Sequence, residues 1–343
     1  MKKISVVILN WNGVGMLQKF LPKVVEYSKG KGVEICVADN GSTDESVAWL
    51  EANCSDVRII ILDKNYGFAE GYNRAFQQVE SEYVVLLNSD VEVTPHWLDS
   101  LVEYMDAHPE VAACQPKVRS ELAKEHFEYA GAAGGYLDKY GYPFCRGRIF
   151  DVVEKDYGQY DTVQSIFWAT GAALFIRLKS YREVGGLDAR FFAHMEEVDL
   201  CWRLRSRGYL LVCVPESVVY HVGGGTLNKE NPRKTFLNFR NNLLMLYKNL
   251  PDKELRKVLF VRGVLDWVAV LVFWLKGERK SAYAVLQARK EFKHIRTEFV
   301  DSRADNLKKM IAPNIPERVK YSILWKFHIG RKKVFTSLPI MRK

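Results

Sequence analysis

The sequence predicts an α/β protein with a mostly parallel β-sheet flanked by helices and a helical appendage at the C-terminal end. Over the first 120 residues, apolar runs of strand length alternate with helix-like segments, the pattern of a sheet covered on both faces. The 343 residues, 48% of them hydrophobic, suit one large domain plus an appendage. We expect the domain to span 1–250 and a basic, amphipathic helical region to span 251–343.

The first half of the chain contains five apolar runs that we interpret as strands. They lie near residues 4–10, 33–39, 57–62, 83–88 and 111–115. After the fourth run, Thr94 and Pro95 are the residue types of an N-cap and a first helical position, which predicts a helix to about His108.

The next segment is less regular. Residues 127–159 are rich in glycine, tyrosine and charge, and their aromatic content favours an ordered loop over a disordered excursion. Strands are expected again at 167–178 and 209–222. A helix is expected between them from Glu196 to about Arg207, ended by Gly208.

Polar residues follow three of the predicted strands. Ligands of such sheets bind beyond the carboxyl ends of the strands, so these residues mark the candidate site. They are Asn10, Trp11, Asn12, Asp39, Asn40, Asn88, Ser89 and Asp90.

Charge and cysteine content narrow the class of protein. Of the formal net charge of +9, residues 276–343 carry +12, from 18 Lys and Arg against 6 Asp and Glu, which leaves −3 for the rest. The six cysteines form no C-x-x-C motif, and several lie in apolar strand-like runs, so we expect free thiols and a reduced, cytoplasmic setting. The short apolar run after Met1-Lys2-Lys3 reads better as a first strand than as a signal peptide.

An acidic cluster, Glu196, Glu197 and Asp199, stands where the later helix begins. Mutual repulsion makes such a cluster costly, so it usually serves a metal, a proton or a helix end. The alternative is a solvated acidic helix start, in which Asp199 pairs with Arg203 one turn later.

Four segments in a fixed order carry a family resemblance. They are ISVVILNWN (4–12), VEICVADNGSTDES (33–46), NYGFAEGYNRA (65–75) and YVVLLNSDVEVTPHW (83–97). With FFAHMEEVDLCWR (191–203), they resemble the inverting glycosyltransferase family 2, rhamnosyltransferase-like branch, over about residues 1–250. The resemblance implies a GT-A-like fold and transfer of a sugar from a nucleotide sugar.

The resemblance implies which residues bind the nucleotide sugar. Asp39 follows an apolar strand and is suited to accept the imide N–H of a pyrimidine, although DNGST is also an ordinary turn whose Asp caps the next helix. NYGFAEGYNRA supplies a glycine turn and a helix start for ribose and phosphate. The full set is Asn10, Trp11, Asp39, Asn40, Gly67, Asn73, Arg74, Asn88, Ser89 and Asp90.

A divalent metal, Mg²⁺ or Mn²⁺, is also implied. Asn88-Ser89-Asp90 has the position of a D-x-D motif with its first acid replaced, so Asp90 would be the main ligand to an ion that neutralises the diphosphate. His221, after a strand and before three glycines, matches a metal-ligating position in the family. The alternatives are an ordinary loop at Asp90 and a structural histidine.

The family pattern E-D-x-D corresponds to Glu196-Glu197-x-Asp199 here, with glutamate in place of the commoner aspartate. Glu197 then stands where the general base removes a proton from the acceptor hydroxyl, and Glu196 orients sugar hydroxyls. Acceptor contacts are expected from Trp168, Thr170, Gly171 and His194. Trp168 is equally suited to the core.

The C-terminal region predicts membrane contact. Residues 258–275 are apolar but contain Arg262 and Asp266, which favours an interfacial or buried amphipathic helix over a membrane span. A basic helix follows, and tryptophans suit a lipid interface. We expect peripheral attachment to the anionic inner face of the cell membrane, the alternative being a solvated tail. Nucleic acid is not expected, because no recognition motif accompanies the basic residues.

The function expected from these features is metal-dependent, inverting transfer of a sugar, with rhamnose favoured by the resemblance. The donor would be a UDP- or dTDP-sugar, and the acceptor a glycan or lipid-linked glycan of a surface polysaccharide. The chain lacks a complete P-loop, a G-x-G-x-x-G motif and the Q-x-x-R-W of processive synthases. The alternatives are a sugar-nucleotide nucleotidyltransferase and a non-catalytic, membrane-associated nucleotide-sugar- or carbohydrate-binding protein. The oligomeric state does not follow from the sequence.

Overall fold

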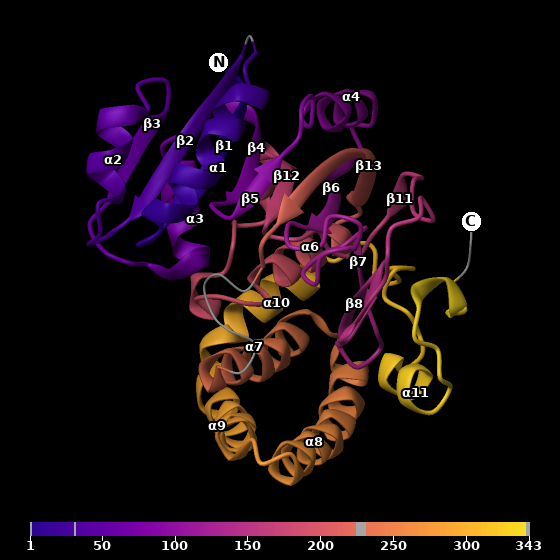
Figure 1. The fold of residues 1–343 in the computed structure, drawn as a ribbon. Coiled ribbons are helices and arrows are strands. Elements are labelled where there is room, and N and C mark those ends of the chain that lie inside the picture. Colours follow the sequence, from indigo (N-terminus) through magenta and orange to yellow (C-terminus); the bar gives the residue numbers. More distant parts are fainter. Residues whose placement is uncertain (1, 31, 224–230, 341–343) are drawn as a thin grey trace.

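The fold is built on a nine-stranded β-sheet (Figure 1). The structure, a computed structural model, describes residues 2–30, 32–223 and 231–340, so two of the three glycines after His221 lie outside the described residues. The strand order is β11-β13-β6-β12-β4-β1-β2-β3, and β5 pairs with β13. The strands are β1 (Lys2–Asn10), β2 (Val33–Asn40), β3 (Arg58–Leu62), β4 (Ser81–Asn88), β5 (Val91–Val93), β6 (Val111–Ser120), β11 (Gln164–Ser165), β12 (Ala173–Arg177) and β13 (Leu210–His221).

The first four long strands pair in parallel, as the apolar runs predict. β1 lies between β2 and β4, and β3 follows β2. In this register Asn10 is opposite Asp39, and Leu9 is opposite Asn88. The polar residues that follow β1, β2 and β4 therefore lie along one edge of the sheet. The predicted α/β fold with a central sheet flanked by helices is confirmed, but the sheet is mixed, because β12 pairs antiparallel with β4 and β6, and β13 pairs antiparallel with β5 and β11.

Helices cover both faces of the sheet. Val6 and Ile8 of β1 belong to a core formed with α1 (Val14–Tyr27), α2 (Ser46–Asn53) and α4 (Asp99–Ala107). Val7, which points to the opposite face, belongs to a core formed with α3 (Gly67–Gln77), α5 (Leu178–Glu183) and α6 (Glu196–Ser206). The alternation follows from the two-residue period of a strand, with both faces apolar because both are buried.

Two predicted elements differ from the structure. The helix after β5 begins at Asp99 instead of Thr94, because the Thr94 hydroxyl donates to the Val218 carbonyl and His96 has a φ of 62°. The strand expected over 167–178 is confined to β12, because the backbone of Trp168 pairs instead with Gly135. The helix expected from Glu196 is confirmed, and Gly208 after it has a φ of +88°.

The glycine- and tyrosine-rich segment is ordered, as predicted, but it forms a second sheet that the sequence did not indicate. Its four antiparallel strands are β7 (Gly135–Leu137), β8 (Pro143–Cys145), β9 (Arg148–Ile149) and β10 (Val152–Val153). Gly135 is required here, since an added Cβ would lie 2.1 Å from the Trp168 ring.

The C-terminal part of the described chain is helical. α8 and α9 form a hairpin that extends away from the sheet, whereas α11 lies beside the second sheet (Figure 1). The helices are α7 (Pro232–Asn249), α8 (Asp252–Leu275), α9 (Arg279–Ile295), α10 (Val300–Lys308) and α11 (Ile323–His328), with short 3₁₀ turns at Ala189–Phe191, Arg296–Phe299 and Phe335–Ser337.

The last described segment shares the core of the α/β domain. Ile323 and Phe335 belong to the same apolar cluster as Val7 of β1. The backbone N–H of Val319 donates to the Leu137 carbonyl at 2.8 Å, and that of Ile323 donates to the Asp138 carboxylate at 2.9 Å. The region beyond residue 250 therefore includes parts that complete the fold as well as the projecting hairpin.

α8 presents its apolar residues outward and its charges inward. Arg262 and Asp266 are buried and pair with each other, and Asp266 also pairs with Arg289 of α9. The outer face is exposed, with Phe260 at 76% and Trp267 at 61%. Within the described residues, α8 is the one helix long and apolar enough to cross a membrane, judged by length and composition, and 17% of its most apolar window is buried.

Candidate active site

The carboxyl ends of β1 and β2 are joined by side-chain hydrogen bonds. The Asn10 amide donates to Asp39 Oδ1 at 3.1 Å, and the Ser42 N–H donates to Asp39 Oδ2 at 2.9 Å. Asp39 thus serves the turn, as its alternative interpretation required. A carboxylate accepts about four hydrogen bonds, so both Asp39 oxygens retain capacity for a ligand. Trp11 is 51% exposed on the same edge.

Asn40 positions the start of α3. Its Oδ1 accepts the Tyr66 N–H at 3.0 Å, and its Nδ2 donates to the Gly67 carbonyl at 3.1 Å. Gly67 has a φ of +77°, and a Cβ there would lie 2.6 Å from the Phe192 ring. A glycine is therefore needed both for the backbone conformation and for the close approach of the segment that precedes α6.

The two other predicted residues of α3 lie differently. Asn73 accepts from the Tyr181 hydroxyl and the Leu187 N–H and donates to the Leu187 carbonyl, so its side chain supports the chain after α5. The structure does not bring Asn73 to the sheet edge. Arg74 pairs with Glu70 at 2.8 Å and lies 3.8 Å from the centre of the Tyr66 ring.

A second cluster lies where β4 and β13 end. His221 Nε2 is 3.1 Å from Asp90 Oδ1 and 3.5 Å from the Asn88 amide nitrogen, so the structure brings the predicted metal-binding residues together. Glu128, which the sequence did not indicate, lies 3.4 Å from His221 Nδ1. Ser89 lies beside Gly13 near the end of β1.

The electrostatics of this cluster are those of an ion pair. Burial disfavours the charged imidazolium, but Asp90 and Glu128 outweigh it and raise the pKa of His221 to about 10. Burial likewise opposes ionisation of Asp90, yet the hydrogen bond with His221 keeps the pKa of its carboxyl below the usual value.

The donor atoms of this cluster suit a divalent metal ion. A carboxylate oxygen and an imidazole nitrogen 3.1 Å apart are donors that Mg²⁺ and Mn²⁺ accept, so Asp90 and His221 fit such an ion. His221 would first have to lose its proton. In the described part of the chain, no three His, Cys, Asp or Glu side chains form a metal-binding group, so the rest of the coordination would come from ligand and water.

The segment between Phe191 and Glu196 holds the backbone in an uncommon conformation. Phe192, His194 and Met195 all have positive φ, of 65°, 70° and 72°. For residues other than glycine this conformation costs roughly 1–3 kcal/mol each, and it persists where surrounding contacts enforce it. Such strain is concentrated at active sites, and here it immediately precedes the acidic cluster.

Contacts from two helices hold this segment. The Phe192 carbonyl accepts the Phe68 N–H of α3 at 2.9 Å. The buried Asn241 side chain of α7 donates to the carbonyls of Phe191, Ala193 and His194 at 2.8–2.9 Å. Asn241 thus connects α7 to the residues before α6. No prediction from the sequence included Asn241, although the polar triplet Arg240-Asn241-Asn242 directly precedes the apolar LLML run of this helix.

Glu196 and Glu197 begin α6, and neither pairs with a cation in the described part of the chain. Glu196 is 4% exposed, Glu197 is half-buried, and one carboxylate oxygen of each lacks a hydrogen-bond partner in the described structure. Burial raises the pKa of both carboxyls, and the charge of Glu197 raises that of Glu196 further. Glu197 lies against Gly171 and is the more accessible of the two.

Asp199 has a different environment. It is fully buried and pairs with Arg203 at 2.9 Å and Lys248 at 2.8 Å, and it accepts from the Asn249 amide at 2.7 Å. Although burial opposes ionisation, the charges of Lys248 and Arg203 lower its pKa. The predicted pairing with Arg203 is present, and Asp199 anchors α6 to α7.

The predicted acceptor residues divide into two groups. Gly171 lies next to Glu197, and His194 lies in the strained segment. Burial and then the charge of Lys234 lower the pKa of His194 to about 4, so it is neutral at pH 7. Thr170 is buried and accepts the Ala172 N–H. Trp168 is 4% exposed and donates to the Tyr136 carbonyl, which makes it a core residue and corrects its assignment as an acceptor contact.

Comparison with family models identifies the class of protein. The chain matches the models "Glycosyl transferase family 2" over residues 5–157 and "Glycosyl transferase family group 2" over residues 83–274. The protein therefore belongs to glycosyl transferase family 2 and is a glycosyltransferase. This class agrees with a sheet whose carboxyl edge carries Asp39 and Asp90, and with the two glutamates that begin α6.

The relatives include rhamnosyltransferases. The N-acetylglucosaminyl-diphospho-decaprenol L-rhamnosyltransferase of Mycobacterium tuberculosis is 25% identical over 232 residues, which cover 64% of this chain and 75% of the relative. The rhamnosyltransferase WbbL of Escherichia coli is 25% identical over 163 residues, covering 46% of this chain and 61% of WbbL. These matches favour the glycosyltransferase over the two alternatives considered from the sequence.

Solved structures share the fold. TarS residues 1–349 of S. aureus, in complex with UDP-GlcNAc, align with a TM-score of 0.56 at 14% identity, covering 90% of this chain and 89% of that one. The mannosyltransferase PcManGT of Pyrobaculum calidifontis, in complex with GDP-Man and Mn²⁺, aligns with a TM-score of 0.52 at 12% identity, covering 91% and 86%. The predicted GT-A-like fold is confirmed.

Removal of the Asn241 amide should lower the rate of catalysis although every proposed catalytic side chain is still present. Asn241→Ala and the isosteric Asn241→Asp both leave three carbonyls without their donor, so the strained segment relaxes and Glu197 moves. We expect kcat of sugar transfer to fall about 10²-fold, the effect of a misplacement of about 1 Å. Asn238→Ala is the matched control, because its amide donates only within α7, to Lys234. A kcat of Asn241→Asp within twofold of the wild type would contradict the positioning role.

Proposed function

We propose that this protein is a metal-dependent, inverting glycosyltransferase. It moves a sugar from a UDP- or dTDP-sugar to a hydroxyl of a glycan or lipid-linked glycan, in the assembly of a surface polysaccharide. Rhamnose is favoured as the sugar because rhamnosyltransferases are among the relatives. The observation that carries the proposal is the position of Glu197, which has a raised pKa and lies at the start of α6 against Gly171.

Glu197 is the proposed general base. Its carboxylate accepts the proton of the acceptor hydroxyl while that oxygen attacks the anomeric carbon from the face opposite the leaving diphosphate. A raised pKa makes Glu197 a stronger base once ionised. Glu196, one residue earlier and more deeply buried, is proposed to orient sugar hydroxyls.

The donor is proposed to lie along the carboxyl edge of the sheet. Trp11 is exposed there, and Asp39 and Ser89 carry polar groups at the same edge. Arg74 would exchange its pairing with Glu70 for the donor, and Asn10, Asn40 and Gly67 shape the turns of this edge. A divalent ion held by Asp90 and His221 would neutralise negative charge on the departing diphosphate. Asn88 would support that site through His221.

The division at residue 250 is also proposed as a functional one. Residues 1–250 carry every candidate catalytic residue, whereas 251–343 would attach the enzyme to the inner face of the cell membrane. Support comes from the exposed apolar face of α8 and the basic residues that follow it. The Arg262–Asp266 pair, which weakened the apolar pattern of the sequence, points inward and leaves that face uninterrupted.

The role of Glu197 predicts a pH profile. Because the base must be ionised and its pKa is raised above 4.5, kcat/KM should fall as pH decreases, with a midpoint above that of an ordinary glutamate. Glu197→Gln should lower kcat by about 10²- to 10⁴-fold while donor binding stays near that of the wild type. Glu196→Gln should leave the acid limb near that of the wild type, because Glu196 has the higher pKa and is uncharged when Glu197 ionises. Undiminished turnover by Glu197→Gln would reject this assignment.

The donor class and metal are tested by thermal unfolding of the purified protein with UDP, dTDP, GDP, CMP or ATP, each with and without Mn²⁺ or Mg²⁺. A metal-dependent rise in Tm of a few degrees is expected for UDP or dTDP, because a ligand that binds the folded state stabilises it. Asp90→Ala should lose the response. A response led by ATP, or none to any diphosphate, would count against the proposed function.

Membrane attachment is tested by sedimentation with vesicles that contain phosphatidylglycerol. The full chain should sediment with them, and Trp267→Glu combined with Leu271→Glu should release it, because charged groups on the outer face of α8 are costly in an apolar interface. The control places glutamate at Leu122 and Tyr157, both 78% exposed and outside α8. Equal sedimentation of the two double variants would exclude α8 as the contact.

A further inference from the structure

A groove of 660 Å³ lies between the first turns of α7 and the first turns of α9. Among the residues that the structure describes, its lining combines three cations with two aromatic rings and includes no acid. The lining residues are Pro232, Arg233, Phe236, Arg279, Lys280, Tyr283, Ala284 and Gln287. Such a surface is complementary to a ligand that carries negative charge beside an apolar portion.

The cations of this groove lack carboxylate partners. Within the described ranges, the side chains of Arg279 and Lys280 form no ion pair or hydrogen bond, and the Arg233 guanidinium lies over the Phe192 ring at 5.4 Å. Like charges held together without a counter-charge repel one another, and a bound anion relieves that repulsion.

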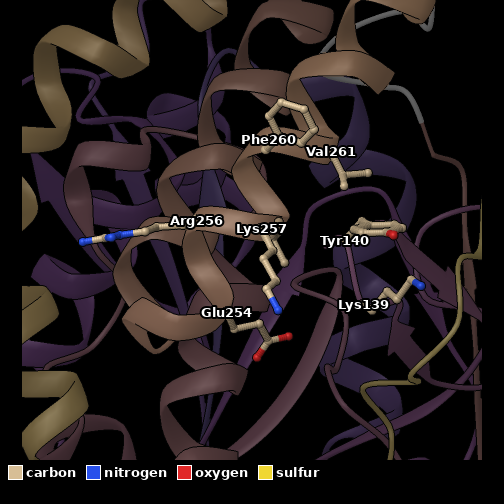
Figure 2. Close-up of a pocket in the computed structure, with 8 residues that line it drawn as sticks. Lys139, Tyr140, Glu254, Arg256, Lys257, Phe260 and Val261 are labelled. Atoms are coloured by element: carbon tan, nitrogen blue, oxygen red, sulfur yellow. The ribbon is translucent and has the colours of Figure 1, made fainter.

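A second groove provides a contrast. It has a volume of 640 Å³ and lies along α8 beside Lys139 and Tyr140 (Figure 2). It also contains basic residues, but Glu254 lies among them and pairs with Arg318. This groove therefore carries its own negative charge and is the poorer match for an anion.

The position of the α7–α9 groove connects two features already described. At one end, Arg233 lies over the ring of Phe192. Phe192 begins the strained segment that ends at Met195, two residues before Glu197. At the other end, Arg279 begins α9 shortly after Trp274 and Leu275, which are 58% and 69% exposed at the end of α8. The groove thus runs from the proposed membrane face toward the proposed base.

We propose that this groove binds the phosphate of the lipid-linked acceptor, and this inference rests on the proposed function. Arg279, Lys280 and Arg233 bind the phosphate or diphosphate that joins lipid to sugar. Phe236 and Tyr283 pack against the first apolar units of the lipid, whose remainder lies along the exposed end of α8. The sugar beyond the phosphate is then directed past Phe192 toward Glu197.

The test is direct binding of farnesyl diphosphate to the full chain in EDTA, with farnesol as the uncharged analogue. Charge reversal by Arg279→Glu with Lys280→Glu should raise the Kd for farnesyl diphosphate at least tenfold, while farnesol binds both proteins weakly and equally. Acidic residues are tolerated in the first turn of a helix, so the double variant should fold. Lys290→Glu with Lys293→Glu is the control, since both lysines are exposed on the same helix outside the groove.

Further arms separate the possible sites and sources. Asp90→Ala should bind farnesyl diphosphate as the wild type does, which excludes the proposed nucleotide site. UDP binding with Mn²⁺ should be the same in the groove variant and in the wild type. If the wild type itself did not bind UDP, that result would count against the proposed function and not against the groove. Equal affinities of the groove and control variants would overturn the proposal. Competition by dihexanoylphosphatidylglycerol at similar concentration would also overturn it, because the site would then serve membrane lipid headgroups.

Discussion

The candidate site depends on three hydrogen bonds from one buried amide. Asn241 holds the carbonyls of Phe191, Ala193 and His194, and these residues occupy or adjoin a backbone with repeated positive φ. The same segment receives the first N–H groups of α3 at the Phe192 carbonyl and continues directly into Glu196. The helices α3, α6 and α7 are therefore positioned through a single short loop. Contacts from α3 and α7 offset the backbone strain of that loop.

The three acids at the start of α6 have two kinds of environment, and the difference comes from their partners. Lys248, Arg203 and Asn249 surround Asp199, so this carboxylate stays ionised and structural. Glu196 and Glu197 also pay for burial but have no cation beside them among the described residues, so the pKa of both carboxyls rises. A cluster that would be destabilising if all three were alike thus provides one anchor and one pair suited to proton transfer.

The parts of the fold that were predictable are those whose signal is local. Buried parallel strands are continuous apolar runs, and their polar ends had to lie along one edge, which placed Asp39, Asn88 and Asp90 together. The strands of the second sheet, two or three residues long, have no such signal, because they exist through tertiary pairing. Trp168 and Asn73 were misassigned for the same reason: their partners, Tyr136 and Leu187, are remote in sequence. Glu128, beside His221, is remote from it as well.

The shared core has a consequence for biosynthesis. Ile323 and Phe335 pack into the cluster that includes β1, yet they are synthesised after α8 and α9. An apolar helix therefore emerges while the body that should support it still lacks part of its interior. Such an intermediate exposes apolar surface and is prone to aggregate. Under the proposed membrane attachment, a nearby bilayer would shield the exposed face of α8 during that interval and would therefore also assist folding.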